Sequence, residues 1–140
     1  MSDPASASAR EAWLLMSDLV LDHQRRREVS DALGMSFGRA RALRRLARRP
    51  MSMGDLAAAL EIDPANATVL VDELEAQKLA RRRPHPTDRR AKLVEATRKG
   101  KDMARRADAI LSTPPPALSA LTASDLETLR RLLEGVSARR

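Results

Sequence analysis

The feature that most limits the possible folds is a pair of short helices, each with its own start signal, joined by a three-residue turn. Ser52 and Asp55 form the S-x-x-D capping pattern that opens the first helix. Asp63 is a favourable N-cap for the second, and Pro64 takes the first helical position, where its missing N–H costs nothing. The second helix then has an apolar stripe at Ala67, Leu70, Val71 and Leu74. This pattern predicts a helix-turn-helix.

Two short strand patterns follow directly, at residues 79–83 and 91–97, with the polar loop PHPTDRR between them. Ser36 is positioned to cap a helix before the motif and Thr97 a helix after it. Thr122 and Asp125 repeat the capping pattern before a last helix. The expected fold is therefore mainly α with a small two- to three-stranded β-wing, that is, a winged helix-turn-helix flanked by N- and C-terminal dimerisation helices.

The length of 140 residues allows one domain with a single core. We expect a flexible leader at residues 1–8 and one domain at 9–140. Within that domain, residues 36–97 form the winged motif with its tip at 84–90, and residues 9–34 and 98–140 form the dimerisation helices. The first helix, expected from about Ser8 to Ser30, is apolar around its whole circumference, which suggests two neighbours, one of them another subunit. The expected interface residues are Trp13, Leu126, Leu129 and Leu133.

The positive charge of the chain is concentrated in one segment. The net charge is +7, but the segment from Arg81 to Arg106 holds eleven basic and three acidic residues, so the remainder is close to neutral. A local excess of this kind is typical of a surface that binds a polyanion. An arginine-rich surface that is only solvated is the alternative on charge alone.

Several function classes lack the residues that they need. There is no cysteine, and His23 and His85 lie far apart without a frame of carboxylates, so we expect no metal, no cofactor and no enzyme activity. No apolar run approaches the roughly 20 residues that cross a bilayer, and the N-terminus has no signal pattern, so we expect a cytoplasmic protein without a membrane partner. An aromatic content of 1% argues against stacking on single-stranded nucleic acid.

In the order of its elements and in three stretches of sequence, the chain resembles the MarR family of bacterial transcription regulators from about Ala12 to Val136. The stretches are LAAALEIDPANATVLVDELEAQKLARR, PTDRRAKLVEATRKG and LTASDLETLRRLL. The resemblance implies a homodimer that binds a pseudo-palindromic operator in double-stranded DNA. It also implies that binding of a small aromatic or phenolic ligand releases the protein from the operator. The family commonly has a basic residue where Val69 stands and a glycine where Lys78 stands, so the chain departs from the pattern at both positions.

A DNA-binding surface follows from the motif and from this resemblance. The start of the second helix would enter the major groove with Pro64, Ala65, Asn66, Thr68 and Val69. The resemblance implies that Arg90 enters the minor groove from the wing, with Asp88 holding its side chain extended. Phosphate contacts are expected from Ser52, Arg83, Arg89 and Lys92. The ligand pocket implied by the family would be lined by Trp13, Met16, His23 and Phe37.

Two other functions remain compatible with the sequence. The first is an architectural DNA-binding protein without sequence preference. The acidic second half of the second helix of the motif, the recognition helix, argues against this function. The second is a winged-helix module that binds other proteins, against which the charge of the wing argues. The operator sequence, the ligand, the regulated genes and the sign of regulation are not encoded in any motif of the chain.

Overall fold

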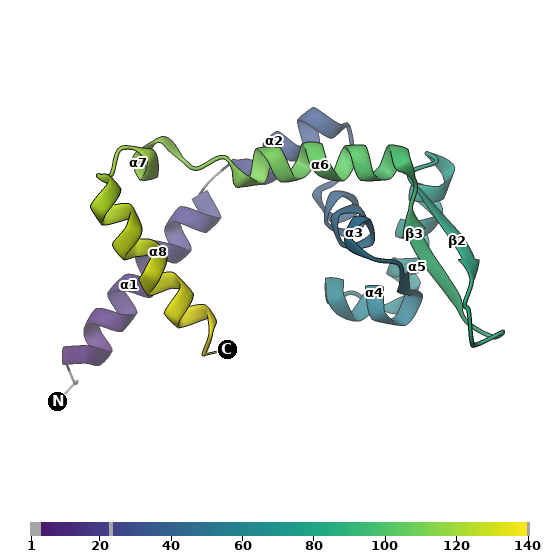
Figure 1. Ribbon diagram of the computed structural model, residues 1–140, viewed down its shortest axis with the longest axis horizontal. Coiled ribbons are helices and arrows are strands. Elements are labelled where there is room, and N and C mark those ends of the chain that lie inside the picture. The colour runs from purple at the N-terminus through teal and green to yellow at the C-terminus, as the bar shows by residue number, and fades with distance from the viewer. Residues whose placement is uncertain (1–3, 23, 140) are drawn as a thin grey trace.

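The computed structural model describes residues 4–22 and 24–139, which form helices around a small three-stranded sheet (Figure 1). The expected mainly α fold with a β-wing is confirmed. The elements in chain order are α1 (Pro4–Asp22), α2 (Arg25–Leu33), α3 (Phe37–Arg48), β1 (Met51–Ser52), α4 (Met53–Leu60), α5 (Pro64–Ala76), β2 (Ala80–Pro84), β3 (Lys92–Ala96), α6 (Arg98–Ser112), α7 (Pro116–Ser119) and α8 (Ala123–Ser137).

Five helices begin at the side-chain caps that the sequence predicts. In each, the cap oxygen accepts a hydrogen bond from the backbone N–H three residues further on, at 2.8–3.3 Å. The caps are Ser36 for α3, Ser52 for α4, Asp63 for α5, Thr97 for α6 and Thr122 for α8. The helix-turn-helix of α4 and α5 is thus built from local signals.

The sheet has the antiparallel order β1-β3-β2, and β3 is central. Met51 of β1 pairs with Val94, and Arg82 of β2 pairs with Val94 from the other side. Because side chains alternate along a strand, Val94 and Arg82 lie on the inner face of the sheet, and Arg81 and Glu95 lie on its outer face. Val94 is fully buried in the core.

The hydrophobic core lies where α3 crosses α6 and where both meet α2 and the inner face of the sheet. Its largest fully buried side chains come from α3, α4, α5 and the turn before β2: Leu43, Leu46, Leu56, Leu74 and Leu79. Gly100, near the start of α6, is also buried and packs on the backbone carbonyl of Leu79. This core fixes the angle between the recognition helix α5 and the wing.

The expected single helix over residues 8–30 is wrong, because the structure has two helices, α1 and α2. The first begins at Pro4, inside the segment expected as a leader, and ends at Asp22, and the second begins at Arg25. The break lets α2 bury Val29 in the core while α1 extends away from it (Figure 1). A straight apolar helix could not face the core over its whole length.

The turn after α5 is strained at Lys78, which adopts the left-handed conformation with a φ of 60°. This conformation costs residues with a Cβ about 1–2 kcal/mol, whereas glycine adopts it freely. We expect Lys78→Gly to raise the free energy of unfolding by about 1 kcal/mol in a urea titration. Gln77→Gly is the matched control, since the φ of Gln77 is −89°. That control should lose stability, and equal effects of both variants would contradict the strain at Lys78.

The two terminal helices lie at the end of the molecule opposite the wing (Figure 1). On α1, Trp13 is 65% exposed, and Leu14, Leu15, Leu19, Val20 and Leu21 are also exposed. On α8, Leu132, Leu133 and Val136 are exposed, whereas Leu126 and Leu129 are half-buried. No helix in the described part of the chain is both long and apolar enough to span a membrane.

Candidate nucleic-acid interface

The first two turns of α5 present a continuous exposed surface. Its members are the five residues expected in the major groove, Pro64, Ala65, Asn66, Thr68 and Val69, all of which are exposed. Ala67, between them, is fully buried and anchors the helix to the core. Val69 is 56% exposed, which is unusual for a large apolar side chain and leaves it available to a thymine methyl group.

Both polar residues of this surface already form local hydrogen bonds. The side-chain amide of Asn66 donates to Asp63 at 2.7 Å, and the hydroxyl of Thr68 donates to the carbonyl of Pro64 at 3.0 Å. The side-chain carbonyl of Asn66 and the lone pairs of Thr68 therefore remain as acceptors. This surface offers thymine methyl contacts and acceptors for base amino groups, and it has no cation in its first two turns.

The acidic second half of α5 is neutralised by two arginines from other elements. Arg82 of β2 forms ion pairs with Asp72, at 2.8 Å, and with Glu75. Arg39 of α3 donates from Nε to Glu73 at 2.6 Å. These pairs reduce the repulsion that the three carboxylates would exert on DNA phosphates.

We expect Arg82→Gln to weaken binding to DNA as well as folding. It leaves two carboxylates unpaired on the recognition helix, and because Arg82 is 23% exposed the cost to stability should be about 1 kcal/mol. DNA affinity should fall several-fold at low salt, and the loss should shrink as salt screens the acids. Arg44→Gln is the matched control, because it removes one ion pair with Asp108 outside α5. The role of Arg82 is contradicted if both variants bind DNA equally in fluorescence anisotropy.

The wing tip is organised by His85, which the sequence interpretation did not include in the site. Its Nδ1 accepts hydrogen bonds from the backbone N–H groups of Thr87, at 3.2 Å, and Asp88, at 3.1 Å. The backbone N–H of His85 also donates to the carbonyl of Ala91 across the loop, at 3.3 Å. The prolines on both sides of His85 were the available signal of a fixed turn. The imidazole thus closes the loop that carries Arg89 and Arg90.

Asp88 acts on Arg90 through the backbone rather than through the guanidinium group. Its carboxylate Oδ1 accepts a hydrogen bond from the backbone N–H of Arg90 at 2.9 Å. Within the described residues, no ion pair joins the two side chains, and the extension of the Arg90 side chain by Asp88 remains a prediction. Asp88 sets the direction of the chain at Arg90, and the arginine side chain stays exposed.

A groove of about 390 Å³ connects the start of α4 with the wing. Ser52, Arg90 and Lys92 line it together with Arg82, so three residues expected to contact DNA from separate parts of the sequence are neighbours here. Arg89 is exposed at the wing tip. Arg83 is placed differently, since its Nε lies 3.0 Å from Glu95 on the outer face of the sheet.

The residues expected to line a ligand pocket are not gathered in one protomer. Trp13 and Met16 lie on α1, and Phe37 lies at the start of α3, where the guanidinium of Arg26 is 5.2 Å from its ring centre. α1 and α3 are well separated in Figure 1, so these side chains belong to separate parts of the fold. His23 lies outside the described residues.

A capped helix-turn-helix followed by a charged hairpin defines the class of winged helix-turn-helix proteins. A model of the MarR family matches residues 33–91, from the end of α2 to the wing tip. Over these residues, which are less than half of the chain, the chain is similar to that family.

The solved structures show how far the fold extends beyond that match. RV1404 from Mycobacterium tuberculosis has 22% identity and a TM-score of 0.76, over 99% of this chain and 96% of that one. Wild-type MarR from E. coli, in its apo form, has 22% identity and a TM-score of 0.70, over 84% of this chain and 91% of that one. AbsC, a MarR family transcriptional regulator from Streptomyces coelicolor, has 21% identity and a TM-score of 0.66, over 99% and 96%. The comparison with curated protein sequences gave no match.

Proposed function

We propose that this protein is a homodimeric repressor of its own and neighbouring genes, which acts in the cytoplasm on a pseudo-palindromic operator. The observation that carries the proposal is the groove between the start of α4 and the wing, in which Ser52, Arg90 and Lys92 meet. The start of α5 would enter a major groove while the wing reaches the adjacent minor groove, where a narrow A·T tract attracts arginine.

Dimer formation is supported by the apolar surface of the terminal helices. Trp13 on α1 and Leu133 and Val136 on α8 are large apolar side chains that one protomer leaves exposed. Burial of this surface against a second copy would stabilise the dimer by about 25 cal/mol for each Å² of apolar surface removed from water. Two recognition helices about 34 Å apart would then read two half-sites on one face of the duplex. The weak set of base contacts on each α5 makes this doubling necessary for tight binding.

Release by a small aromatic or phenolic ligand is the remaining part of the proposal. Trp13 and Met16 would contribute from α1, together with Phe37 and with His23, which lies outside the described residues. Since one protomer does not gather these side chains, the pocket would have to be completed by the dimer. Titration of the operator complex with a panel of phenolic compounds tests this, and release of DNA is the expected result.

The experiment that tests the central proposal is anisotropy with two labelled duplexes of equal length, measured over a range of salt concentrations. One carries the DNA upstream of the protein's own gene, and the other is a scrambled sequence. We expect the first to bind at least ~10³-fold more tightly at physiological salt. The proposal would be wrong if the protein bound both duplexes equally and with a steep salt dependence, and also bound all fragments of a genomic library equally. An architectural DNA-binding role would then replace it.

A further inference from the structure

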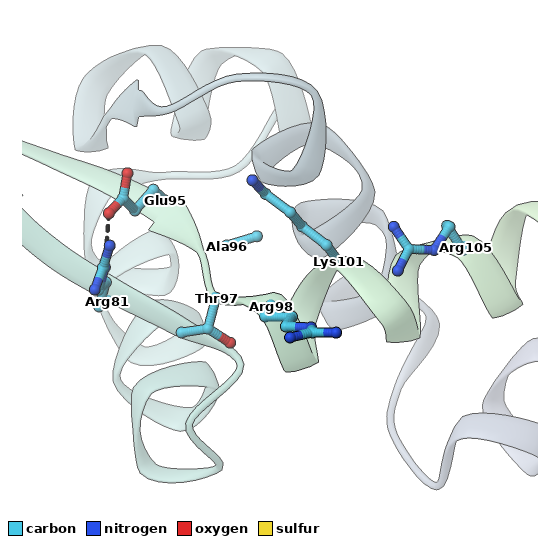
Figure 2. Close-up of a pocket in the computed structure, with 7 residues that line it drawn as sticks. All are labelled: Arg81, Glu95, Ala96, Thr97, Arg98, Lys101 and Arg105. Atoms are coloured by element: carbon cyan, nitrogen blue, oxygen red, sulfur yellow. Dashed lines mark hydrogen bonds and ion pairs between the residues drawn. The ribbon is translucent and has the colours of Figure 1, made fainter.

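A second basic cleft lies between the outer face of the wing and the start of α6. It has a volume of about 540 Å³ and is lined mainly by charged side chains (Figure 2). Arg81 and Glu95 line it from β2 and β3, and Arg98, Lys101 and Arg105 line it from α6. The three α6 residues are spaced i, i+3 and i+7, which places them on one face of the helix.

Two of the four cations in this cleft already form ion pairs, Arg81 with Glu95 and Arg105 with Asp102. Glu95 is its one acidic residue, and it accepts a hydrogen bond from Arg81 at 2.6 Å. That hydrogen bond lowers the pKa of Glu95, and the charges of Arg83 and Lys101 act in the same direction, so the carboxylate is ionised and already paired. In the described chain, the side chains of Arg98 and Lys101 take part in no ion pair.

The cleft is separate from the DNA-binding surface. Residues 81 and 95 lie on the outer face of the sheet, whereas Arg82, next in sequence, points to α5 on the inner face. The groove beside α5 is lined by Ser52, Arg90 and Lys92, none of which lines this cleft. The two basic regions therefore lie on opposite sides of the wing.

The shape and lining of the cleft restrict its ligand. From Arg98 to Arg105 the helix rises about 10 Å, so a single carboxylate or phosphate could not meet all three cations of α6. The side chains at the cleft are charged or small, without an aromatic or large aliphatic group, and this excludes binding driven by apolar contact. Cations at three positions on one helix face, with Arg81 opposite, suit an elongated ligand that carries several negative charges.

We propose that this cleft binds a small molecule with two or more linked phosphate groups. The phosphates would lie along α6 on Arg98, Lys101 and Arg105, with Arg81 closing the opposite side. The start of α6 adds favourable potential, because the helix dipole places partial positive charge at this end of the helix. Such a ligand would connect the wing strands to α6, which leads from the winged motif towards α7 and α8 (Figure 1).

Isothermal titration of the full chain with tripolyphosphate and with orthophosphate, at constant ionic strength, tests the site. Tripolyphosphate should bind, and the double variant Arg98→Gln with Lys101→Gln should reduce its affinity at least ~10-fold, since charge-assisted hydrogen bonds are lost. Orthophosphate should bind the parent at least ~10-fold more weakly than tripolyphosphate, because it cannot reach all of the cations at once. Both residues are exposed, so the thermal melting of the variant should match that of the parent.

The matched control is Arg41→Gln with Arg45→Gln, which also removes two charges. These residues line an arginine cluster on α3 whose cavity is only about 110 Å³. The control should retain the affinity of the parent for tripolyphosphate. Equal losses in the two variants would show attraction by net charge alone and overturn the proposal. A loss of duplex DNA binding in the Arg98 and Lys101 variant without a loss of tripolyphosphate binding would make the cleft a DNA contact and also overturn it.

Discussion

Replacing Gly100 with alanine should destabilise the protein more than the addition of a single methyl group at any other helix position. A Cβ at this position would overlap the carbonyl oxygen of Leu79 and lie 3.0 Å from Cδ1 of Leu43. The same carbonyl accepts a hydrogen bond from Thr97 at 3.0 Å, so the backbone has little freedom to move away. We expect the free energy of unfolding to fall by about 3 kcal/mol in a denaturant titration.

Gly38→Ala is the matched control for this prediction. Gly38 is an exposed residue of α3, and the nearest atom to an added Cβ is the Ser36 hydroxyl at 4.0 Å. Because alanine favours helix by up to about 1 kcal/mol over glycine, this variant should be unchanged or slightly stabilised. Both proteins must be compared at one concentration, since association contributes to the stability of a dimer. Equal stability of the two variants would show that α6 does not pack on Leu79 as described.

Replacing Arg90 with alanine should cause the largest loss of DNA affinity. A dimer loses one minor-groove arginine from each wing, and at about 1–2 kcal/mol for each contact the affinity for the operator should fall roughly 100-fold. The slope of log affinity against log salt should decrease by about two, one for each wing. The side chain is exposed and has no ion pair in the described residues, so the melting temperature should not change.

Arg131→Ala provides the control for Arg90, because it removes one exposed charge from α8, far from the wing. Its operator affinity should stay within about twofold of the parent. Asp88→Ala should fall between the two, since it removes the acceptor of the Arg90 backbone N–H but leaves the guanidinium group in place. If Arg90→Ala bound the operator as tightly as the parent, the wing would not be the minor-groove element.

The sequence predicted local contacts correctly, but it did not predict contacts between residues that are distant in the chain. Asp63 caps α5 through an N–H three residues away, and spacing in the sequence is sufficient to see this. The contact between Arg39 and Glu73 joins residues 34 positions apart, and no periodicity reveals it. The acids of α5 were accordingly expected to repel DNA, whereas the folded chain pairs them with arginines from α3 and β2.

The same distinction applies to the basic run at the start of the wing. Arg81, Arg82 and Arg83 are equivalent as sequence, and Arg83 was expected to contact phosphates. In the structure Arg82 pairs with α5 on the inner face, while Arg81 and Arg83 pair with Glu95 on the outer face. The two-residue alternation of a strand is predictable, but the face that meets α5 is set by the packing of Val94 in the core.

The sequence by itself determined the order of the elements from α4 to β3, the starts of five helices and the charged wing, because caps, turns and strand periods depend on residues within one or two turns of the chain. Only the tertiary structure decided where α1 separates from α2, which arginines neutralise the recognition helix and which residues meet in the groove beside Arg90. These features depend on the burial of Val29, Leu79 and Val94 in one core. Packing of that core brings together side chains that are distant in the chain, and no local pattern specifies the result.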